Sequence, residues 1–292
     1  MIVWDMKSRR LKMPKYNLLS SGSTKIEKSN KLSDEWFSRI VYLAPDDLAD
    51  GKNTLCPYAK IAKCSEACLN TAGMGKFSNV QQSRIRKSLL FLNDRQEFMR
   101  QLVQDINKFL KECDRLGKKP ALRLNGTSDI QWENIPIKNN NYEISNMYLL
   151  QKYAKYFEGY GHPQWKPCKE LVDLGWQEAN NIFELFPQIQ FYDYTKIPTR
   201  KVEHIPNYHL TWSYSEANDK YATLFDKVSN NIAVVFRDAL PKMFKGLKVI
   251  DGDKHDMRFL DETQVVVGLI EKGEAKKDTS GFVIDLINAR AI

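Results

Sequence analysis

Three of the five cysteines lie close together in the sequence. Cys56, Cys64 and Cys68 fall within 13 residues, with seven residues between the first two and three between the last two. The other two, Cys113 and Cys168, stand alone. An odd number of cysteines argues against a disulfide framework. Thiolates are soft ligands for zinc and for the irons of an iron–sulfur cluster. The spacing therefore predicts a metal centre.

The number of neighbouring ligands indicates which metal this centre holds. A structural zinc site uses four protein ligands, and neither a histidine nor a fourth cysteine lies near the three cysteines in the sequence. Three thiolates can instead hold a four-iron, four-sulfur cluster and leave one iron open to a substrate or a second cofactor. We predict a [4Fe–4S] cluster at Cys56, Cys64 and Cys68, with zinc as the alternative.

Further polar residues follow stretches whose composition predicts β-strands. They are Asn125, Gly126, Thr127 and Asp129 after 121–124, Asp193, Tyr194 and Lys196 after 189–192, and Ser213, Ser215 and Glu216 after 208–212. The carboxyl ends of parallel strands meet at one edge of a sheet, so we expect these side chains to converge there with the cysteines. The carboxylates among them, with Asp251 and Asp253, could also form a two-metal nuclease site, although Asp251-Gly252-Asp253 is more typical of a turn.

Alternating helical and strand-like segments supply the scaffold for these residues. A short strand at 40–43 precedes a cysteine-cluster loop at 56–75, and apolar residues at helical spacing predict a helix over 95–116 that ends at Gly117. Further helices are expected at 80–92, 147–157, 171–186 and 217–228, and further strands at 232–236, 247–250 and 265–269. We predict an α/β fold, a partial or open (β/α) barrel with a largely parallel sheet. Residues 1–35 are expected to form a polar N-terminal arm, and residues 36–292 a single domain.

The chain carries an excess of positive charge that is confined to one segment. Residues 51–120 hold 14 basic and 6 acidic side chains, a surplus of 8 that equals the net charge of the whole chain. A localised basic segment suggests an anionic partner such as a nucleic acid or a nucleotide. Arg84, Arg86 and Lys87 are the candidate phosphate contacts, and a solvated helix face is the alternative interpretation.

The composition also bears on the cellular compartment. No apolar run approaches the roughly 20 residues of a membrane span, and residues 1–15 mix charged and apolar residues instead of forming a secretory signal. We therefore expect a cytoplasmic protein without a membrane partner. The sequence predicts no oligomeric state.

Several motifs together resemble a phage-encoded family known as gene product 88-like. The resemblance covers roughly residues 40–285. Its motifs are Cys56-Pro57, Cys64, Cys68–Gly73, Val80-Gln81, Arg84, Arg86-Lys87, Arg123–Ile130, Phe191–Lys196 and Tyr208–Ser213. A phage origin implies that the protein works in the host cytoplasm.

The order of features also resembles radical S-adenosylmethionine enzymes, in which a strand, a three-cysteine loop, a helix and a second strand follow one another. That resemblance implies that Asn125, Gly126, Thr127 and Asp129 line a pocket for S-adenosylmethionine. Asp193, Tyr194, Lys196, Ser213, Ser215 and Glu216 would then face the substrate. The first hypothesis is an enzyme that acts on a nucleic acid or nucleotide. The second is a non-enzymatic nucleic-acid-binding protein with a structural zinc or no metal.

Overall fold

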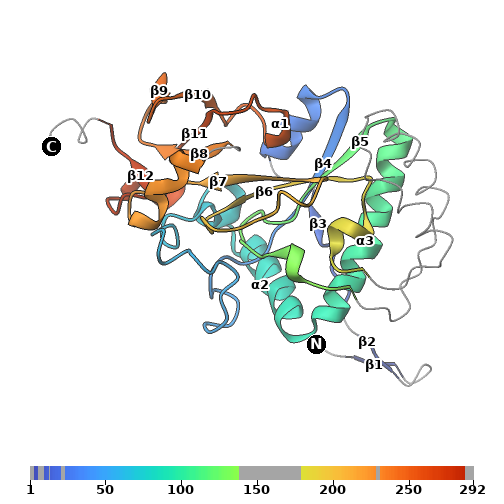
Figure 1. Ribbon diagram of the computed structural model, residues 1–292. Coiled ribbons are helices and arrows are strands. Elements are labelled where there is room, and N and C mark those ends of the chain that lie inside the picture. The colour runs from blue at the N-terminus through green and yellow to red at the C-terminus, as the bar shows by residue number, and fades with distance from the viewer. Residues whose placement is uncertain are drawn as a thin grey trace.

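The computed structural model describes residues 3–5, 10–12, 14–20, 24–137, 179–227 and 231–286 (Figure 1). The helix expected at 147–157, most of the one expected at 171–186, and Cys168 lie outside the described residues. None of the described helices is long and apolar enough to cross a membrane.

A ten-stranded, largely parallel sheet forms the centre of the molecule. Its strands are β3 (Leu19–Ser20), β4 (Trp36–Val41), β5 (Lys119–Arg123), β6 (Gln190–Thr195), β7 (Tyr208–Ser213), β8 (Ile232–Phe236), β9 (Met243–Phe244), β10 (Leu247–Asp251), β11 (Val266–Ile270) and β12 (Val283–Ile284). They run in the order β3-β4-β5-β6-β7-β8-β11-β10-β9, with β12 also paired to β8. Only β3–β4 and β9–β10 pair antiparallel. The sheet does not close, so the predicted open α/β fold is confirmed. A separate two-stranded sheet consists of β1 (Val3–Asp5) and β2 (Arg10–Lys12).

Strands β4 to β8 are consecutive in the chain, adjacent in the sheet and parallel. Right-handed crossovers between such strands place every loop that follows a strand at the same edge. We call this edge the carboxyl rim, and it comprises the loops that follow β4, β5, β6, β7 and β8. The three clustered cysteines and the candidate residues predicted after β5, β6 and β7 belong to these loops or to the last residues of the strands before them.

Helices α2 (Ser78–Asn93) and α3 (Arg95–Leu116) connect β4 to β5 and pack against each other. The Asp94 side chain caps α3 by accepting a hydrogen bond from Glu97 N, and Gly117 ends the helix in the left-handed conformation with φ of 64°. The predicted apolar face is confirmed, because Phe98, Leu102 and Ile106 are fully buried.

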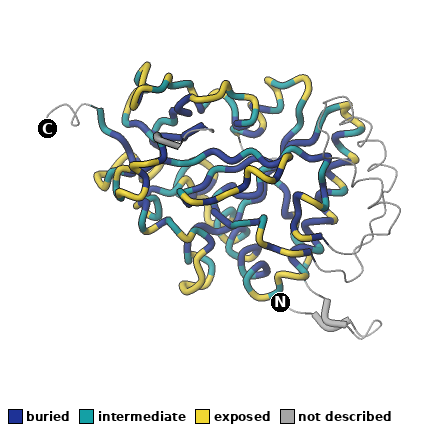
Figure 2. Tube along the Cα trace, viewed as in Figure 1, coloured by how far each residue is buried: buried dark blue, intermediate teal, exposed yellow. Residues whose placement is uncertain are grey.

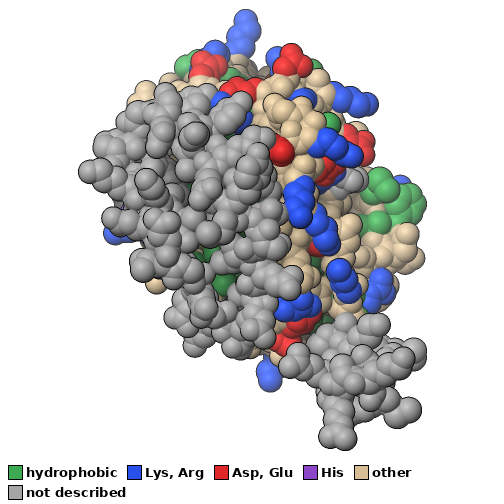
Figure 3. Space-filling view, turned by 90° about the vertical axis from the view of Figure 1, so that its right-hand side faces the viewer, with side chains coloured by type: hydrophobic (Ala, Val, Ile, Leu, Met, Phe, Trp, Pro, Cys, Tyr) green, Lys and Arg blue, Asp and Glu red, His purple; other side chains and the backbone are tan. Residues whose placement is uncertain are grey.

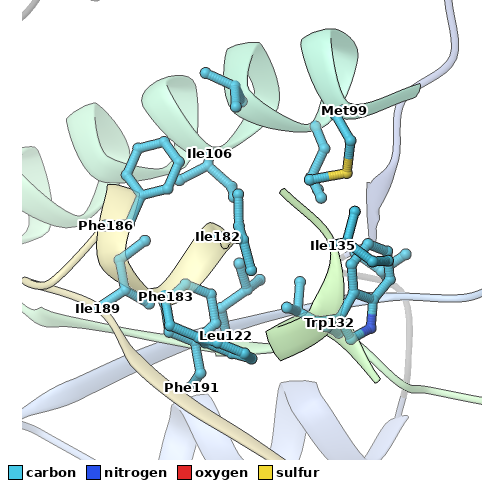
Figure 4. Close-up of a cluster of buried hydrophobic side chains, with 14 of the residues drawn as sticks. Met99, Ile106, Leu122, Trp132, Ile135, Ile182, Phe183, Phe186, Ile189 and Phe191 are labelled. Carbon is cyan, nitrogen blue, oxygen red and sulfur yellow. The ribbon is translucent and has the colours of Figure 1, made fainter. Parts of the chain in front are cut away.

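The main core lies between α3 and one face of the sheet. Figure 4 shows Met99 and Ile106 of α3 above a layer formed by Leu122, Trp132 and Phe183. The short helix α6 (Ile182–Leu185) contributes to this layer. Figure 2 shows that the buried positions follow the strands of the sheet and the inward side of the helices. This core therefore holds α3 and the first half of the sheet in a fixed relation.

The remaining helical segments are short. They are α1 (Thr24–Leu32) and the 3₁₀ helices η1 (Leu69–Thr71), η2 (Gly73–Lys76), η3 (Trp132–Asn134), η4 (Asp219–Lys227), η5 (Arg258–Leu260) and η6 (Gly273–Lys277). The helix expected at 217–228 is thus a 3₁₀ helix. Within the N-terminal segment expected to form an arm, Leu18 and Ile26 are fully buried, and Leu18 N donates to the Asp105 carboxylate at 2.8 Å.

Candidate cysteine site at the carboxyl rim

Asp46 ties together the loop that carries the cysteines. Its backbone NH lies 3.3 Å from Cys56 Sγ, and its carboxylate accepts hydrogen bonds from Thr54 Oγ1 at 2.8 Å and Ser65 Oγ at 2.6 Å. Leu55 N donates to Asp46 O at 2.9 Å. One side chain thereby fixes residues before and after the first cysteine.

The second and third cysteines occupy tight turns of the same loop. Cys64 N donates to Ala59 O at 3.1 Å, which closes the turn after Cys56. Cys68 caps the 3₁₀ helix η1, and its Sγ accepts from Asn70 N at 3.5 Å. Local hydrogen bonds thus fix the backbone beside Cys64 and Cys68.

The three thiols lie in one partly buried electrostatic neighbourhood. Burial raises the pKa of all three thiols, that of Cys68 to about 11, and the charges of Cys64 and Cys68 further raise the pKa of Cys56. Among the described residues, no group of three or more His, Cys, Asp or Glu side chains is close enough to hold a metal ion. The mutual effect of their charges makes the three thiols neighbours at this edge of the sheet.

The structure brings the cysteine loop together with the loops that follow β5 and β7. Asp129 N donates to Leu55 O at 2.8 Å, and the Cys56 thiol lies 3.7 Å from Thr127 O. From the loop after β7, Ser215 Oγ donates to Ala62 O at 2.8 Å. Segments far apart in the sequence therefore meet at the carboxyl rim.

Two cations accompany the thiols. Lys196 follows β6, and its Nζ donates to Tyr214 O at 2.8 Å. Burial lowers the pKa of Lys196 to about 8, and the charge of Cys64 opposes that effect. Arg84 of α2 is 8% exposed, stacks 4.5 Å from the centre of the Tyr42 ring and is bonded to the Asn70 side chain. Neither cation lies within 4.0 Å of a carboxylate of the described residues.

Asn125, predicted to bind a cofactor, organises its own loop. Its side-chain oxygen accepts hydrogen bonds from Ser128 Oγ, Ile130 N and Trp132 Nε1 at 2.9 to 3.1 Å, and its Nδ2 donates to Ile130 O. The side chain is 2% exposed. All of its hydrogen-bonding capacity is thus used within the fold.

Asp193 lies within β6, because this strand extends to Thr195 instead of ending at Tyr192. Its carboxylate is fully buried, accepts from Asn125 N at 2.7 Å and Tyr208 Oη at 3.2 Å, and lies 4.0 Å from Arg123. Burial raises the pKa of Asp193 to about 7, and Arg123 opposes that effect. The predicted substrate-facing carboxylate is therefore part of the buried sheet.

Asp129 is a buried carboxylate with several partners. Arg200 lies 3.2 Å from it, and the Thr195 hydroxyl and Lys196 N donate to it at 2.8 and 2.7 Å. Arg200 also pairs with Glu133 at 2.7 Å. These contacts join the loop after β5 to the end of β6, so Asp129 positions Lys196.

The other predicted residues have varied surroundings. A Cβ on Gly126 would meet the Tyr42 ring at 2.6 Å, which leaves no space for a larger residue. The Tyr194 ring lies under the Arg123 guanidinium at 4.7 Å, and its hydroxyl is buried without a partner among the described residues. Ser213 is the last residue of β7 and is half-buried, and Glu216 is exposed.

The three side chains predicted to contact a nucleic acid differ in how far they are exposed. Arg86 is exposed, but Arg84 and Lys87 are only 8% and 9% exposed, and burial lowers the pKa of Lys87 to about 8. Helix α2 thus turns Arg84 and Lys87 inward and leaves Arg86 as the exposed member of the three. The face in Figure 3 carries Lys and Arg side chains with Asp and Glu among them, so it is not uniformly basic.

Sequence reasoning did not identify Asp46, Tyr42 or Arg200 as parts of the site. The signal for Asp46 was its place in the loop directly after a strand, ten residues before Cys56. Arg200 and Tyr42 offered no local signal, because each acts through partners far along the chain.

The fold and the site define an open, largely parallel α/β protein with a three-cysteine loop at its carboxyl rim. A family model described as Gene product 88 matches residues 15–286. The chain therefore belongs to the Gene product 88 family, a family of phage gene products. Neither a curated protein nor a solved structure matches the chain.

Proposed function

We propose that this protein holds an iron–sulfur cluster on Cys56, Cys64 and Cys68 and is a redox enzyme. The observation that carries the proposal is the meeting of these thiols with Lys196 and Arg84. Neither cation has a carboxylate within 4.0 Å among the described residues, and the charges of Cys64 and, more weakly, Asp129 act on Lys196. Buried cations need a compensating negative charge. Metal-bound thiolates would supply it.

The donor set favours a cluster over a single zinc ion. Ligands of one zinc surround a common centre, and no three such side chains do so among the residues that the structure describes. In an iron–sulfur cluster each thiolate binds a different iron, so the sulfurs stand farther apart. Three cysteines without a fourth ligand nearby in the sequence suit a cluster with one open iron.

The protein's own groups would assist in two ways. Thiols must lose their protons to bind metal, and burial holds the pKa of each thiol high. Lys196 beside Cys64 and Arg84 beside Cys68 would favour the thiolates and limit the cost of their burial. Asp46 and Asp129 would keep the loop and Lys196 in position through the contacts described above.

When bound, such a cluster transfers single electrons, and an iron without a protein ligand accepts a further ligand. For that ligand we propose S-adenosylmethionine, and for the substrate a nucleic acid or nucleotide. Support for the first comes from the resemblance in the order of elements, and for the second from the basic surplus of residues 51–120. Lys196, which is only partly buried, is the group suited to an anionic part of either molecule.

Anaerobic purification and reconstitution with iron and sulfide tests the proposal. We expect about four irons per chain and a brown protein. Replacing Cys56, Cys64 or Cys68 by Ser should abolish iron retention, whereas Cys113→Ala should not, because Cys113 lies in the main core. A colourless protein with bound zinc, or equal iron in all variants, would overturn it. Calorimetry with S-adenosylmethionine on the loaded protein tests the finer proposal.

A further inference from the structure

The sheet has a second face, on the side away from α3, and near the carboxyl rim this face carries polar side chains. Successive side chains of a strand point to opposite faces. Leu122 of β5 and Phe191 of β6 pack into the main core, so Arg123 and Tyr194 point to the second face. The segment between β10 and β11 covers part of this face, because Met257 packs against residues of β5 and β6. Arg123 and Tyr194 remain partly exposed, so solvent reaches this end of the second face.

The guanidinium of Arg123 is held on this face with one edge unused. Its Nη1 lies 3.0 and 3.1 Å from the two carboxylate oxygens of Asp256, and it stacks 4.7 Å from the centre of the Tyr194 ring. Its Nε is buried without a hydrogen-bond partner, and no described residue accepts a hydrogen bond from its Nη2. Nε and Nη2 form an edge of the guanidinium that binds two oxygens of an oxyanion side by side. The fixed side chain thus presents an unused fork.

Arg200 shows what a purely structural arginine of this protein looks like. Its Nε and Nη2 bind Glu133 at 2.8 and 2.7 Å, and its Nη1 lies 3.2 Å from Asp129. All three nitrogens are therefore used within the fold. An unpaired buried donor is destabilising, and folded proteins rarely keep one without a function. The unused edge of Arg123 therefore marks a place for a ligand.

The charges around Arg123 favour an anionic ligand. Those that act on Arg123, on its partner Asp256 or on the neighbouring Tyr42 ring are the cations Lys25, Arg84, Arg123 and Arg258 and the carboxylates Asp193, Asp256 and Asp261. Burial raises the pKa of Asp193 to about 7, so this carboxylate is about half protonated at neutral pH. Glu262 pairs with Lys248 at 2.6 Å, and burial lowers the pKa of His255, so neither changes the balance. The surplus is therefore positive.

We propose that Arg123 binds a phosphate group of a ligand that lies on the second face at the carboxyl rim. Ligands of open parallel α/β sheets bind at this edge of the sheet. The Arg123 fork takes two oxygens, and the Tyr194 hydroxyl, which is buried without a partner, takes a third. Thr211, which pairs with Tyr194 in the strand register, adds a second unpaired hydroxyl on the same face. A carboxylate has only two oxygens, so a phosphate group fits this donor set better.

The phosphate site rests on the proposed function only for the carrier of the phosphate group, since a nucleotide is the substrate proposed above. None of the residues of the site is a cysteine, so the site is tested on the protein without a metal. Free phosphate offers the same chemistry. Adenosine monophosphate, inorganic phosphate and adenosine are the probes that separate these sources.

Calorimetric titration of the full chain tests the proposal. We expect adenosine monophosphate to bind, inorganic phosphate to compete with it, and adenosine to bind at least tenfold more weakly. Arg123→Lys keeps a charge opposite Asp256 but loses the fork, so affinity for adenosine monophosphate should fall at least tenfold. The matched control is Arg39→Lys, because Arg39 also stacks on a ring, that of Phe37 at 4.7 Å, and pairs with a carboxylate, that of Glu112 at 2.7 Å. It should keep the wild-type affinity.

A second variant tests the hydroxyl. Tyr194→Phe keeps the ring under Arg123 and should weaken binding of adenosine monophosphate several-fold, with circular dichroism to verify the fold of each variant. Unchanged affinity in a folded Arg123→Lys would overturn the site, and if that variant does not fold, unchanged affinity in Tyr194→Phe would do so. Equal binding of adenosine and adenosine monophosphate, or no binding of either phosphate probe to the wild type, would also overturn it. Failure of the wild type to retain iron would count against the proposed function and leave the phosphate site standing.

Discussion

At the scale of single residues, Asp46 determines the shape of the cysteine loop. Its carboxylate accepts the Thr54 and Ser65 hydroxyls, which lie on either side of Cys56, and its backbone NH points to the Cys56 sulfur. The residue has a φ of 48°, in the left-handed region that Asp tolerates better than most residues.

Replacing Asp46 tests this role. Asp46→Ala removes both hydroxyl contacts, so the loop loosens and iron retention after reconstitution should fall several-fold. Asp46→Asn keeps an acceptor oxygen and tolerates the same backbone conformation, so it should retain most of the iron. Iron and sulfide analysis with far-ultraviolet circular dichroism measures the effect. Full iron content in Asp46→Ala would show that the loop forms without the carboxylate.

Asp193 makes stability depend on pH. In the fold it keeps its proton to about pH 7, whereas its ordinary pKa is 3.8. The folded state therefore binds more protons than the unfolded state between these values, and the contribution of Asp193 to the free energy of unfolding falls as pH rises through this range. Above about pH 7 the contribution is constant.

The variant Asp193→Asn removes this titration while keeping an acceptor for Asn125 N. We expect the wild type to lose stability relative to Asp193→Asn as pH rises from about 4 to about 7, by a few kcal/mol at most. Urea unfolding at several pH values measures the difference. A constant difference between the two proteins over this range would show that Asp193 is ionised throughout.

At the scale of elements, α3 is the helix that supports the site from the side of the core. Its sequence carries an apolar face, an N-terminal Asp94 and a C-terminal Gly117, and each feature acts in the structure as its chemistry predicts. Agreement between local signals and tertiary packing explains why the predicted bounds of the helix at 95–116 match the structure.

Removing the cap of α3 gives a quantitative test. Asp94→Ala should lower the free energy of unfolding by about 1 kcal/mol, because Glu97 N loses its acceptor. Asp94→Asn should cost much less, since Asn caps a helix about as well. Chemical denaturation of both variants measures the difference, and equal stabilities of Asp94→Ala and the wild type would contradict the role of the cap.

At the scale of the whole molecule, Arg200 joins parts of the chain that meet at the rim. Its side chain is fully buried and pairs with Asp129 and Glu133. Its Nη2 lies 3.0 Å from Tyr208 Oη. Through these partners it connects the loop after β5, the 3₁₀ helix η3 and strand β7. Removing the cation would leave two buried carboxylates without their strongest partner.

Arg200→Met should therefore lower the free energy of unfolding by about 3–5 kcal/mol, the usual cost of breaking a buried ion pair from one side. The same substitution at the exposed Arg86 should change it by less than about 0.5 kcal/mol. Denaturant midpoints for both variants compare the two sites directly. Similar midpoints would mean that water reaches Asp129 and Glu133 when Arg200 is absent.

Much of the architecture followed from the sequence because its signals are local. Strand-like runs at 208–212 and 232–236 and the helix at 95–116 appear within a residue or so of their predicted places. The end of β6 was not predicted, because an aspartate after an apolar run is typical of a loop. In the structure Asp193 lies within the strand, where its carboxylate accepts hydrogen bonds from Asn125 N and Tyr208 Oη. The strands β3, β9 and β12 were also not predicted, because runs of two residues carry too little pattern.

The sequence by itself determined the class of fold, the family and the set of cysteines, since periodicity, motifs and residue type are properties of neighbouring positions. Only the tertiary structure decided which polar residues are used up inside the fold, as Asn125 and Asp193 are, and which cations turn inward beside the thiols, as Arg84 does. The physical reason is that burial and hydrogen-bond partners depend on segments far along the chain. A side chain's chemistry is set by its type, but its availability is set by what packs against it.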